Sequence, residues 1–378
     1  MPSNTEPAFL NSAASGVKGQ RTLPASHYLS QETWSAELRQ VWGTRWFCVG
    51  RETDLPGPGS YFVRELGPES LIILRDQKGE VHAHFNVCRH RGTRLCEEKR
   101  GKFSGSIQCP YHAWTYALDG RLLGVPDLET LEGFKKEEHP LHAAAVARWE
   151  GFLFVNLAKS PEPFTTAFAS LIGKWSAWNL PHLVPLARID YDVAANWKLV
   201  MQNYSECYHC SPLHPALVKL SPSHSGGNDL REGPFLGGYM EVTQPGGSLT
   251  VSGRACGVAV GPLAAGDLQR VYYYTLFPNV LLSLHHDYVM VHTLWPDGPA
   301  RTRIECEWLF HPDTAKTPGF DPQDGVRFWD QTNREDWHVS ELTQLGVASS
   351  RYAPGPYSAR EAMSAAFDRE YLLAMAAK

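Results

Sequence analysis

The spacing of apolar and polar residues divides the chain into two regions. From Trp46 to about Val155 the apolar residues form short β-type runs between clusters of Gly, Pro and Asp, which is typical of a small all-β module. The predicted strands of this region cover residues 47–49, 61–63, 71–74, 81–85, 107–108 and 152–155. The stretch 158–163 carries two prolines and is typical of a linker.

The rest of the chain mixes helical and strand-like spacing, which predicts an α+β domain. Helices are expected over residues 27–43, 164–175, 196–209, 325–345 and 359–377, and strands over residues 183–191, 271–277, 280–286 and 303–310. Ser30 is a candidate N-cap for the first helix. We therefore expect an N-terminal helical arm (1–44), a β domain (45–157) and a larger α+β domain (158–378).

Composition narrows the possible partners and compartment. A net charge of −5 over 378 residues argues against nucleic acid or an anionic membrane as the main partner. The sequence has no apolar run of about 18 residues and no secretory signal, so we expect a cytoplasmic protein without a membrane span. Eight cysteines are too few for a disulfide scaffold, and in that compartment the thiols should stay reduced.

Two Cys/His pairs form the first constellation, Cys88-x-His90 and Cys109-x2-His112. Gly92 allows a sharp loop at the first pair, so each pair can hold one side of an inorganic cluster between two loops. Thiolates and imidazoles suit an iron–sulfur cluster or zinc. A gap of one residue is unusual for zinc, where two to four residues are typical.

A carboxylate and two histidines form the second constellation, Glu206-x2-His209-x4-His214. On a helix Glu206 and His209 share a face, and we expect Pro212 to break that helix so that His214 turns inward. Two histidines and one carboxylate form the facial triad of non-haem Fe(II) oxygen chemistry. A zinc site that also uses Cys207 and Cys210 is the alternative.

The stretches CRHRG and CPYHAWTY resemble the binding motif of Rieske [2Fe–2S] proteins. The stretch NWKLVMQNYSECYHCSPLHP resembles the catalytic motif of the Rieske non-haem iron oxygenases, the α subunits of the aromatic-ring-hydroxylating family. This resemblance spans nearly the full chain, from TLPASHY to PGPYSAREAMS. It implies a Rieske domain over 45–157 and a catalytic mononuclear iron domain over 158–378, whose antiparallel sheet is packed by helices in a helix-grip fold.

The resemblance also assigns roles to single residues. It implies that Cys88 and Cys109 hold one iron of the cluster, and that His90 and His112 hold the other. The mononuclear iron ligands would be His209, His214 and Asp336, with Asn203 near the iron and Glu206 bridging the two metal centres. Glu335 is the neighbour most easily confused with Asp336, whereas Asp330 lies about 240° away on a helix and cannot face the same metal. The family commonly has Glu where this chain has Gln202.

Further expectations concern partners. The family works as a head-to-tail homotrimer, in which Glu206 would link His209 to the partner subunit's His112. The sequence has no G-x-G-x-x-G motif after a strand, so a separate flavin/iron–sulfur reductase is implied as the electron donor. The six other cysteines are expected to be packed thiols: Cys48, Cys96, Cys207, Cys210, Cys256 and Cys306.

The substrate is predicted only by class. The catalytic stretch looks most like the glycine betaine, carnitine and stachydrine oxygenases, which hydroxylate or N-demethylate quaternary ammonium compounds. An aromatic pocket would suit such a cation, and His285 or His286 could bind a substrate carboxylate. Candidate pocket aromatics are Tyr204, Tyr208, Tyr272, Tyr273, Tyr274, Trp295 and Trp308. The alternatives are an aromatic acid substrate, or a Rieske electron carrier or redox sensor without oxygenase activity.

Overall fold

The computed structural model describes residues 19–127, 129 and 132–377, which divide into two compact units. The first unit is Trp42–Phe168, and the second joins the described residues up to Val41 with those from Ala169 onward. The segment after residue 157 stays with the first unit because Phe164 packs on Phe154, with ring centroids 5.4 Å apart. The predicted α+β fold class is confirmed, with antiparallel sheets in both units.

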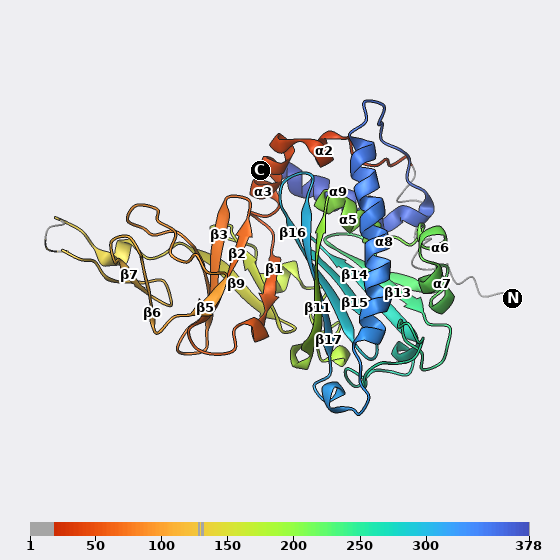
Figure 1. Cartoon of the computed structure of the whole chain (residues 1–378). Helices are drawn as coiled ribbons and strands as arrows, with labels where there is room; N and C mark the ends of the chain where they lie inside the picture. The colour runs from red at the N-terminus through yellow and green to blue at the C-terminus, as the bar shows by residue number, and fades with distance from the viewer. Residues whose placement is uncertain (1–18, 128, 130–131, 378) are drawn as a thin grey trace. The chain divides into compact units, whose positions relative to one another are not determined.

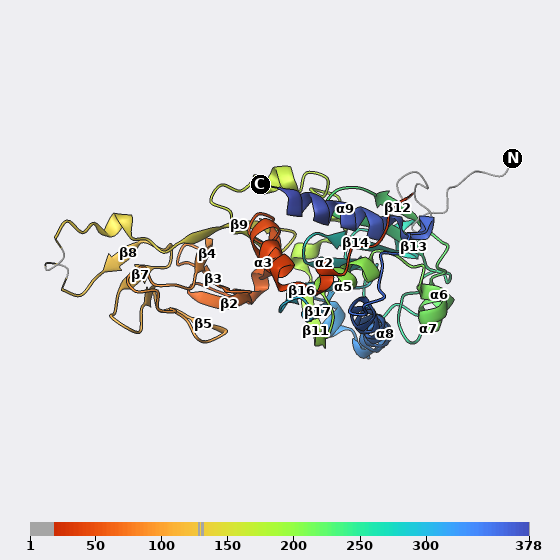
Figure 2. The ribbon, with the colours of Figure 1, turned by 90° about the horizontal axis from the view of Figure 1, so that it is seen from above.

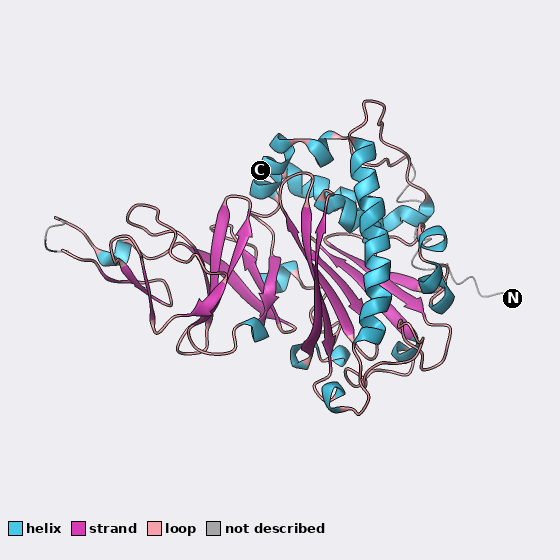
Figure 3. Cartoon of the chain, viewed as in Figure 1, coloured by secondary structure: helices cyan, strands magenta, loops and turns pink. Residues whose placement is uncertain are grey.

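The smaller unit contains two antiparallel sheets (Figure 3). The larger of them has seven strands in the order β1-β10-β9-β4-β3-β2-β5. Their bounds are Phe47–Arg51 (β1), Ser60–Leu66 (β2), Glu69–Arg75 (β3), Val81–Phe85 (β4), Arg100–Lys102 (β5), Ala143–Trp149 (β9) and Phe152–Asn156 (β10). The second sheet has three short strands, Ser106–Gln108 (β6), Thr115–Ala117 (β7) and Leu122–Gly124 (β8).

The larger unit is built on one seven-stranded antiparallel sheet with the order β11-β17-β16-β15-β14-β13-β12 (Figure 1). Its strands are Val184–Val193 (β11), Gly227–Leu230 (β12), Phe235–Glu241 (β13), Arg270–Leu276 (β14), Val280–Leu284 (β15), Val289–Pro296 (β16) and Thr302–Phe310 (β17). Every residue of β15 and β16 is buried, as expected for the central strands of a sheet.

Helices pack on this sheet. The long helix α8 runs across one face of the sheet in Figure 1, and in Figure 2 it is seen end-on while α9 runs lengthwise. Helix α5 contacts both of them. The α-helices are Ser26–Leu29 (α2), Gln31–Gln40 (α3), Phe164–Ala167 (α4), Trp197–Tyr204 (α5), Cys210–Leu213 (α6), Pro215–Leu220 (α7), Gln323–Val347 (α8) and Ala362–Ala376 (α9). Among the described residues, no helix is both long and apolar enough to cross a membrane.

Short 3-10 turns complete the described elements: Glu52–Asp54 (η1), Lys136–Glu138 (η3), Ser176–Trp178 (η4), Leu180–His182 (η5), Asp267–Gln269 (η6), Thr314–Lys316 (η7) and Ala359–Glu361 (η8). Ser30 is an N-cap as predicted, because its hydroxyl accepts from the backbone N–H groups of Glu32 and Thr33. It separates α2 from α3, so the predicted helix 27–43 is two helices.

Two helix predictions were wrong. The helix expected over 164–175 is only α4, a single turn. The helix expected over 196–209 ends at Tyr204, and a separate short helix, α6, follows His209. Pro212 therefore lies inside α6 and does not break a longer helix between the histidines. Apolar periodicity continues through this stretch although the helical backbone does not.

Candidate metal centres

Two loops of the smaller unit repeat one backbone pattern. In the first loop, the Cys88 amide donates to the carbonyl of Thr93 and the Gly92 amide donates back to the carbonyl of Cys88. In the second, Cys109 and Trp114 form the matching pair, and the Ala113 amide donates to Cys109. The residue that closes each turn has positive φ, +75° at Gly92 and +56° at Ala113. Each loop thus curls around one cysteine.

The four predicted cluster residues differ in burial, with the two cysteines buried and the two histidines closer to the surface. Cys88 and Cys109 are each 3% exposed and belong to one apolar core cluster. His90 is exposed and His112 is half-buried, with their ring centroids 4.7 Å apart. Two buried thiols and two outer imidazoles are the donor set of a Rieske cluster, in which cysteines hold one iron and histidines the other.

An orphaned nitrogen supports the fit of such a cluster. The Nδ1 atom of His112 is buried and has no hydrogen-bond partner among the described residues. A buried ring nitrogen without a partner is costly in free energy, and coordination to a metal would satisfy it. The Tyr116 hydroxyl lies 3.2 Å from the Cys88 Sγ and accepts from the Arg89 amide. Tyr116 was not among the predicted site residues, and it is placed to hydrogen-bond a ligand sulfur.

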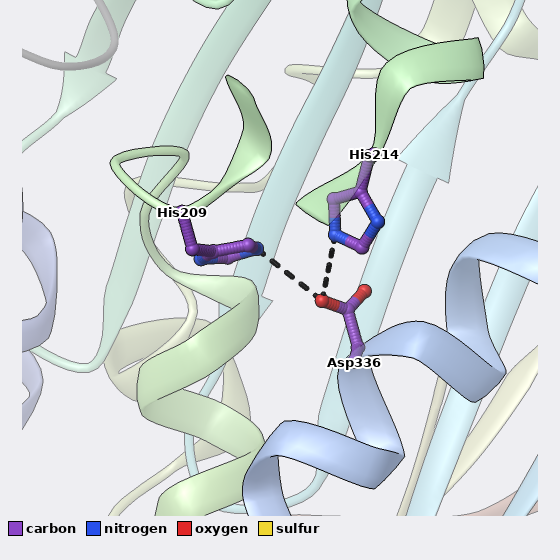
Figure 4. Close-up of side chains that lie close together, drawn as sticks. All are labelled: His209, His214 and Asp336. Carbon is purple, nitrogen blue, oxygen red and sulfur yellow. Dashed lines mark hydrogen bonds and ion pairs between the residues drawn. The ribbon is translucent and has the colours of Figure 1, made fainter. Parts of the chain in front are cut away.

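In the larger unit, His209, His214 and Asp336 converge (Figure 4). One ligand atom from each lies within 4.8 Å of the others. The Asp336 Oδ1 is 3.2 Å from the Nε2 of His209 and 2.9 Å from the Nε2 of His214. The histidines flank α6, and Asp336 comes from α8. This arrangement can hold a metal ion on one face of an imidazole–imidazole–carboxylate triad.

The Nδ1 atom of each histidine, on the side of the ring away from Asp336, contacts a glutamate carboxylate. The Nδ1 of His209 lies 2.6 Å from Oε1 of Glu206, and the Nδ1 of His214 lies 2.7 Å from Oε2 of Glu335. With Nδ1–H donating to a carboxylate, each ring presents the Nε2 lone pair toward Asp336. Glu335, which sequence reasoning treated only as a rival of Asp336, holds a histidine in place.

The electrostatics of the triad favour positive charge. Burial alone would raise the pKa of Asp336, but the two imidazoles hold it well below its usual range. Burial would lower the pKa of His209, but the carboxylates of Asp336 and Glu206 raise it to about 10. A divalent cation could replace the protons that these groups share, since metal binding releases protons from its ligands. The residues present therefore fit a mononuclear Fe(II) ion.

Asp330 lies on another face of α8, as its helical position predicts. Its carboxylate accepts from the Tyr191 hydroxyl at 2.9 Å and from the Arg334 guanidinium at 3.0 Å. Those contacts hold it in a separate cluster of side chains. Asp336 is therefore the one of these two acids that faces the histidines.

Glu206 and the histidines are positioned by a turn between α5 and α6. The Glu206 carboxylate accepts from the backbone amides of Tyr208 and His209, which fixes the turn locally. Cys207 and Cys210 are joined by a disulfide across it, with Cα atoms 4.9 Å apart. The prediction that both are packed thiols was wrong, because the two sulfur atoms are bonded to each other. A pair of sulfur atoms already bonded to each other also offers no thiolates for the alternative zinc site.

Two cavities meet at this turn. A small one of about 50 Å³ borders the triad and is walled by Tyr204, Met240, Tyr273 and Trp329, among others. A larger one of about 490 Å³ lies on the other side. Both cavities share Asn203, Glu206 and His209 in their walls, so these residues form a partition. A third hollow of about 700 Å³ has no triad residue in its wall.

Few of the predicted pocket aromatics reach the small cavity. Tyr204 and Tyr273 line it, and Trp329, which was not predicted, lines it too. His285 is fully buried, stacks on Tyr288 and has neither ring nitrogen hydrogen-bonded among the described residues. His286 instead places its Nε2 3.1 Å from the carbonyl of Gly247.

Comparison with known proteins gives relatives over nearly the whole chain. The glycine betaine monooxygenase oxygenase subunit of Chromohalobacter salexigens is 31% identical over 370 residues, covering 90% of this chain and 82% of the relative. The carnitine monooxygenase oxygenase subunit of Acinetobacter baumannii is 34% identical over 200 residues, covering 52% of this chain and 53% of the relative.

Solved structures share the fold. A crystal structure of the quaternary ammonium Rieske monooxygenase CntA superposes with a TM-score of 0.78 at 24% identity, covering 94% of both chains. Naphthalene 1,2-dioxygenase from Rhodococcus sp. gives a TM-score of 0.76 at 22% identity, again covering 94% of both chains. Because both identities are below 25%, these likenesses support the fold alone.

Two family models match the sequence itself. Residues 45–135 match the Rieske [2Fe-2S] domain, and residues 180–377 match the ring hydroxylating alpha subunit (catalytic domain). The second match covers more than half of the chain, and the fold and donor sets of both units agree with these domains. The chain therefore belongs to the ring-hydroxylating α subunits, the Rieske non-haem iron oxygenases.

Proposed function

We propose that the chain is the oxygenase component of a system that hydroxylates or N-demethylates a small quaternary ammonium compound of the betaine type. The observation that carries the catalytic part is the convergence of His209, His214 and Asp336. These three residues hold the mononuclear iron, and Cys88, His90, Cys109 and His112 hold the cluster. When bound, the cluster supplies single electrons and the mononuclear iron supplies the chemistry of O2.

Electrons come from a separate flavin/iron–sulfur reductase. Each hydroxylation takes up two electrons and two protons with one O2, and releases one water. The chain contains no nucleotide-binding motif through which it could collect electrons from NAD(P)H. A Rieske electron carrier without oxygenase activity would not need a second metal site. The convergence of His209, His214 and Asp336 therefore supports oxygenase activity.

Two observations support the substrate class. A relative that is matched over 82% of its length is a glycine betaine monooxygenase oxygenase subunit. The cavity beside the triad holds about 50 Å³, whereas pockets for drug-sized ligands measure roughly 300–1,000 Å³, so a small group fits better than a fused ring. Tyr204, Tyr273 and Trp329 border it, and aromatic faces attract a quaternary ammonium by about 0.5–2 kcal/mol each.

A substrate panel tests this proposal. We expect O2 uptake with a surrogate reductase to be stimulated by glycine betaine, carnitine or a related betaine. Formaldehyde and the demethylated amine should form in equal amounts if an N-methyl group is hydroxylated. Stimulation by aromatic acids alone, with a hydroxylated ring as product, would refute the quaternary ammonium assignment.

Glu206 has a second role in the proposal. In a head-to-tail homotrimer its carboxylate would connect His209 to the partner subunit's His112 and so provide a short electron path. It lines the larger cavity as well as the smaller one, and neither His214 nor Asp336 is in the wall of the larger cavity. The 2.6 Å contact with His209 Nδ1 gives one half of that connection.

Replacing Glu206 by glutamine should leave both metal centres loaded and lower coupled turnover by about 10- to 100-fold, the usual loss when the partner of a metal-bound histidine is changed. The measurement is the rate at which a pre-reduced cluster is reoxidised by O2 in the presence of substrate. Glu335→Gln is the matched control, because Glu335 holds His214 in the same way. Equal slowing in both variants would mean that Glu206 only orients its histidine.

A further inference from the structure

Helix α9 carries a buried acid that none of the roles above uses. Asp368 is 4% exposed. Its Oδ1 accepts from the Gln202 amide at 2.5 Å, and its Oδ2 accepts from the Tyr357 hydroxyl at 2.7 Å. Both partners are uncharged, although buried carboxylates are normally paired with a cation. Burial disfavours the charged form of such an acid and raises its pKa, while hydrogen bonds donated to the carboxylate act in the opposite direction.

The partners of Asp368 lead to the metal site. Gln202, Tyr357 and Tyr28 all line the larger cavity of about 490 Å³. The Gln202 amide also donates to the Tyr28 hydroxyl at 3.0 Å, so the three side chains form one network with Asp368. The wall of the same cavity also includes the partition formed by Asn203, Glu206 and His209. Asp368 is thus connected through one hydroxyl to a cavity whose wall includes the triad residue His209.

The proposed reaction requires a proton donor near the metal site. Each turnover written above takes up two protons, and the carboxylates of Asp336 and Glu206 are engaged with imidazole nitrogens. Resting on the proposed function, we infer that Asp368 is the proton reservoir of the metal site and delivers protons through the Tyr357 hydroxyl into the cavity beside Glu206. When Asp368 is protonated, its O–H donates to the Tyr357 oxygen, the reverse of the hydrogen bond to the carboxylate form. The Asp368 O–H bond breaks as a new O–H bond forms on Tyr357, the original Tyr357 proton leaves to a proton acceptor in the cavity, and the Asp368 carboxylate takes up a new proton from solvent.

The proton affinity of Asp368 agrees with this role. Burial raises its pKa to about 6, although the hydrogen bonds from Tyr357 and Gln202 and the charge of Lys198 act in the opposite direction. Lys198 is itself paired with Glu37 at 2.5 Å. The titratable or charged groups whose fields reach Asp368 are Lys198 on α5, Tyr28 on α2, Tyr357 before η8, and Arg369 and Tyr371 on α9.

The first test does not depend on any substrate. Infrared difference spectra of the metal-free protein, recorded as the pH is raised, should show the C=O band of a protonated carboxyl group disappearing with a midpoint near pH 6. The band should be missing in Asp368→Asn. A band that persists unchanged in that variant, or no titration in this range, would overturn the inference whatever the enzyme oxidises.

The second test uses the loaded enzyme. Asp368→Asn should keep the iron content and cluster absorption but lower product formation by about 10²-fold, the lower end for a positioned proton donor. The parent rate should fall as the pH rises through about 6, because the acid form is lost, and this dependence should be absent from Asp368→Asn. Asp368→Glu should restore it, and Tyr357→Phe should reproduce the loss by removing the connecting hydroxyl.

Glu361 provides the matched comparison. It lines the same cavity, but its carboxylate accepts from the Ser358 amide at 2.8 Å and closes the turn before α9. Glu361→Gln should retain the parent pH dependence. If that variant loses the dependence while Asp368→Asn keeps it, the proton source is Glu361 and the inference is wrong. A parent enzyme that oxidises no betaine would instead refute the proposed substrate and leave the infrared result standing.

Discussion

Replacing Asp336 by alanine should remove the mononuclear iron and lower the rate of substrate oxidation by more than about 100-fold. This exceeds the loss expected when a residue that only hydrogen-bonds a metal ligand is replaced. Among the residues that the structure describes, Asp336 is the single carboxylate that faces the Nε2 atoms of both His209 and His214. Without it two neutral imidazoles remain, which bind Fe(II) weakly and leave the site without a compensating negative charge. The cluster in the smaller unit should be unaffected, so its absorption should persist.

Metal analysis after anaerobic reconstitution checks this result. The iron content should fall by one per chain in Asp336→Ala, while the two cluster irons remain. Asp330→Asn is the matched control, because Asp330 lies on the same helix but accepts from Tyr191 and Arg334. An Asp336→Ala protein that keeps its full iron content would contradict the assignment. Loss of the iron in Glu335→Ala alone would transfer the ligand role to Glu335.

The second large effect is expected at the cluster. Cys88→Ser should abolish the Rieske absorption, remove two irons per chain and reduce turnover to background, because the catalytic iron would have no stored electron to receive. Cys88 is buried in an apolar core, with its sulfur 3.2 Å from the Tyr116 hydroxyl. The triad lies in the other unit, so the mononuclear iron should remain.

Cys96 supplies the control for this variant. It lies in the same core cluster and is 5% exposed, yet it lies outside the two loops that curl around Cys88 and Cys109. Cys96→Ala should keep the absorption and the iron content. The assignment of the cluster ligands fails if Cys88→Ser retains the Rieske spectrum, or if Cys96→Ala loses it while the protein stays folded.

The grouping of the candidate metal-site residues could be predicted largely because their spacing in the sequence is local. Cys88-x-His90 and Cys109-x2-His112 each lie within one tight loop, and His209 and His214 lie at the two ends of the short helix α6. Asp336 is far away in sequence, and only resemblance to the family singled it out. Its helical position then argued against Asp330, and in the structure Asp330 contacts Tyr191 and Arg334 on another face of α8.

Features that depend on tertiary contacts could not be predicted. Apolar periodicity continued past Tyr204, but the Glu206 carboxylate accepts backbone amides there and forms a turn in place of another helical turn. Cys207 and Cys210 are joined by a disulfide across that turn, and their spacing alone does not distinguish a disulfide from two neighbouring thiols. The predicted ranges do not include the strands β5, β7, β8, β9, β12, β13 and β16. The hydrogen bond between Asp368 and Gln202 joins two helices that are far apart in the sequence, so no local sequence pattern indicates it.

A single-turnover experiment tests the central claim, that electrons stored in the Rieske unit are used with O2 at the triad of the catalytic unit. Protein with both centres reduced would be freed of reductant and mixed with O2 and glycine betaine. Because the two centres together supply two electrons, we expect about one demethylated product and one formaldehyde per mononuclear iron, with the cluster oxidised at the same time. Oxidation of the cluster without product, for every betaine tried, would contradict the account.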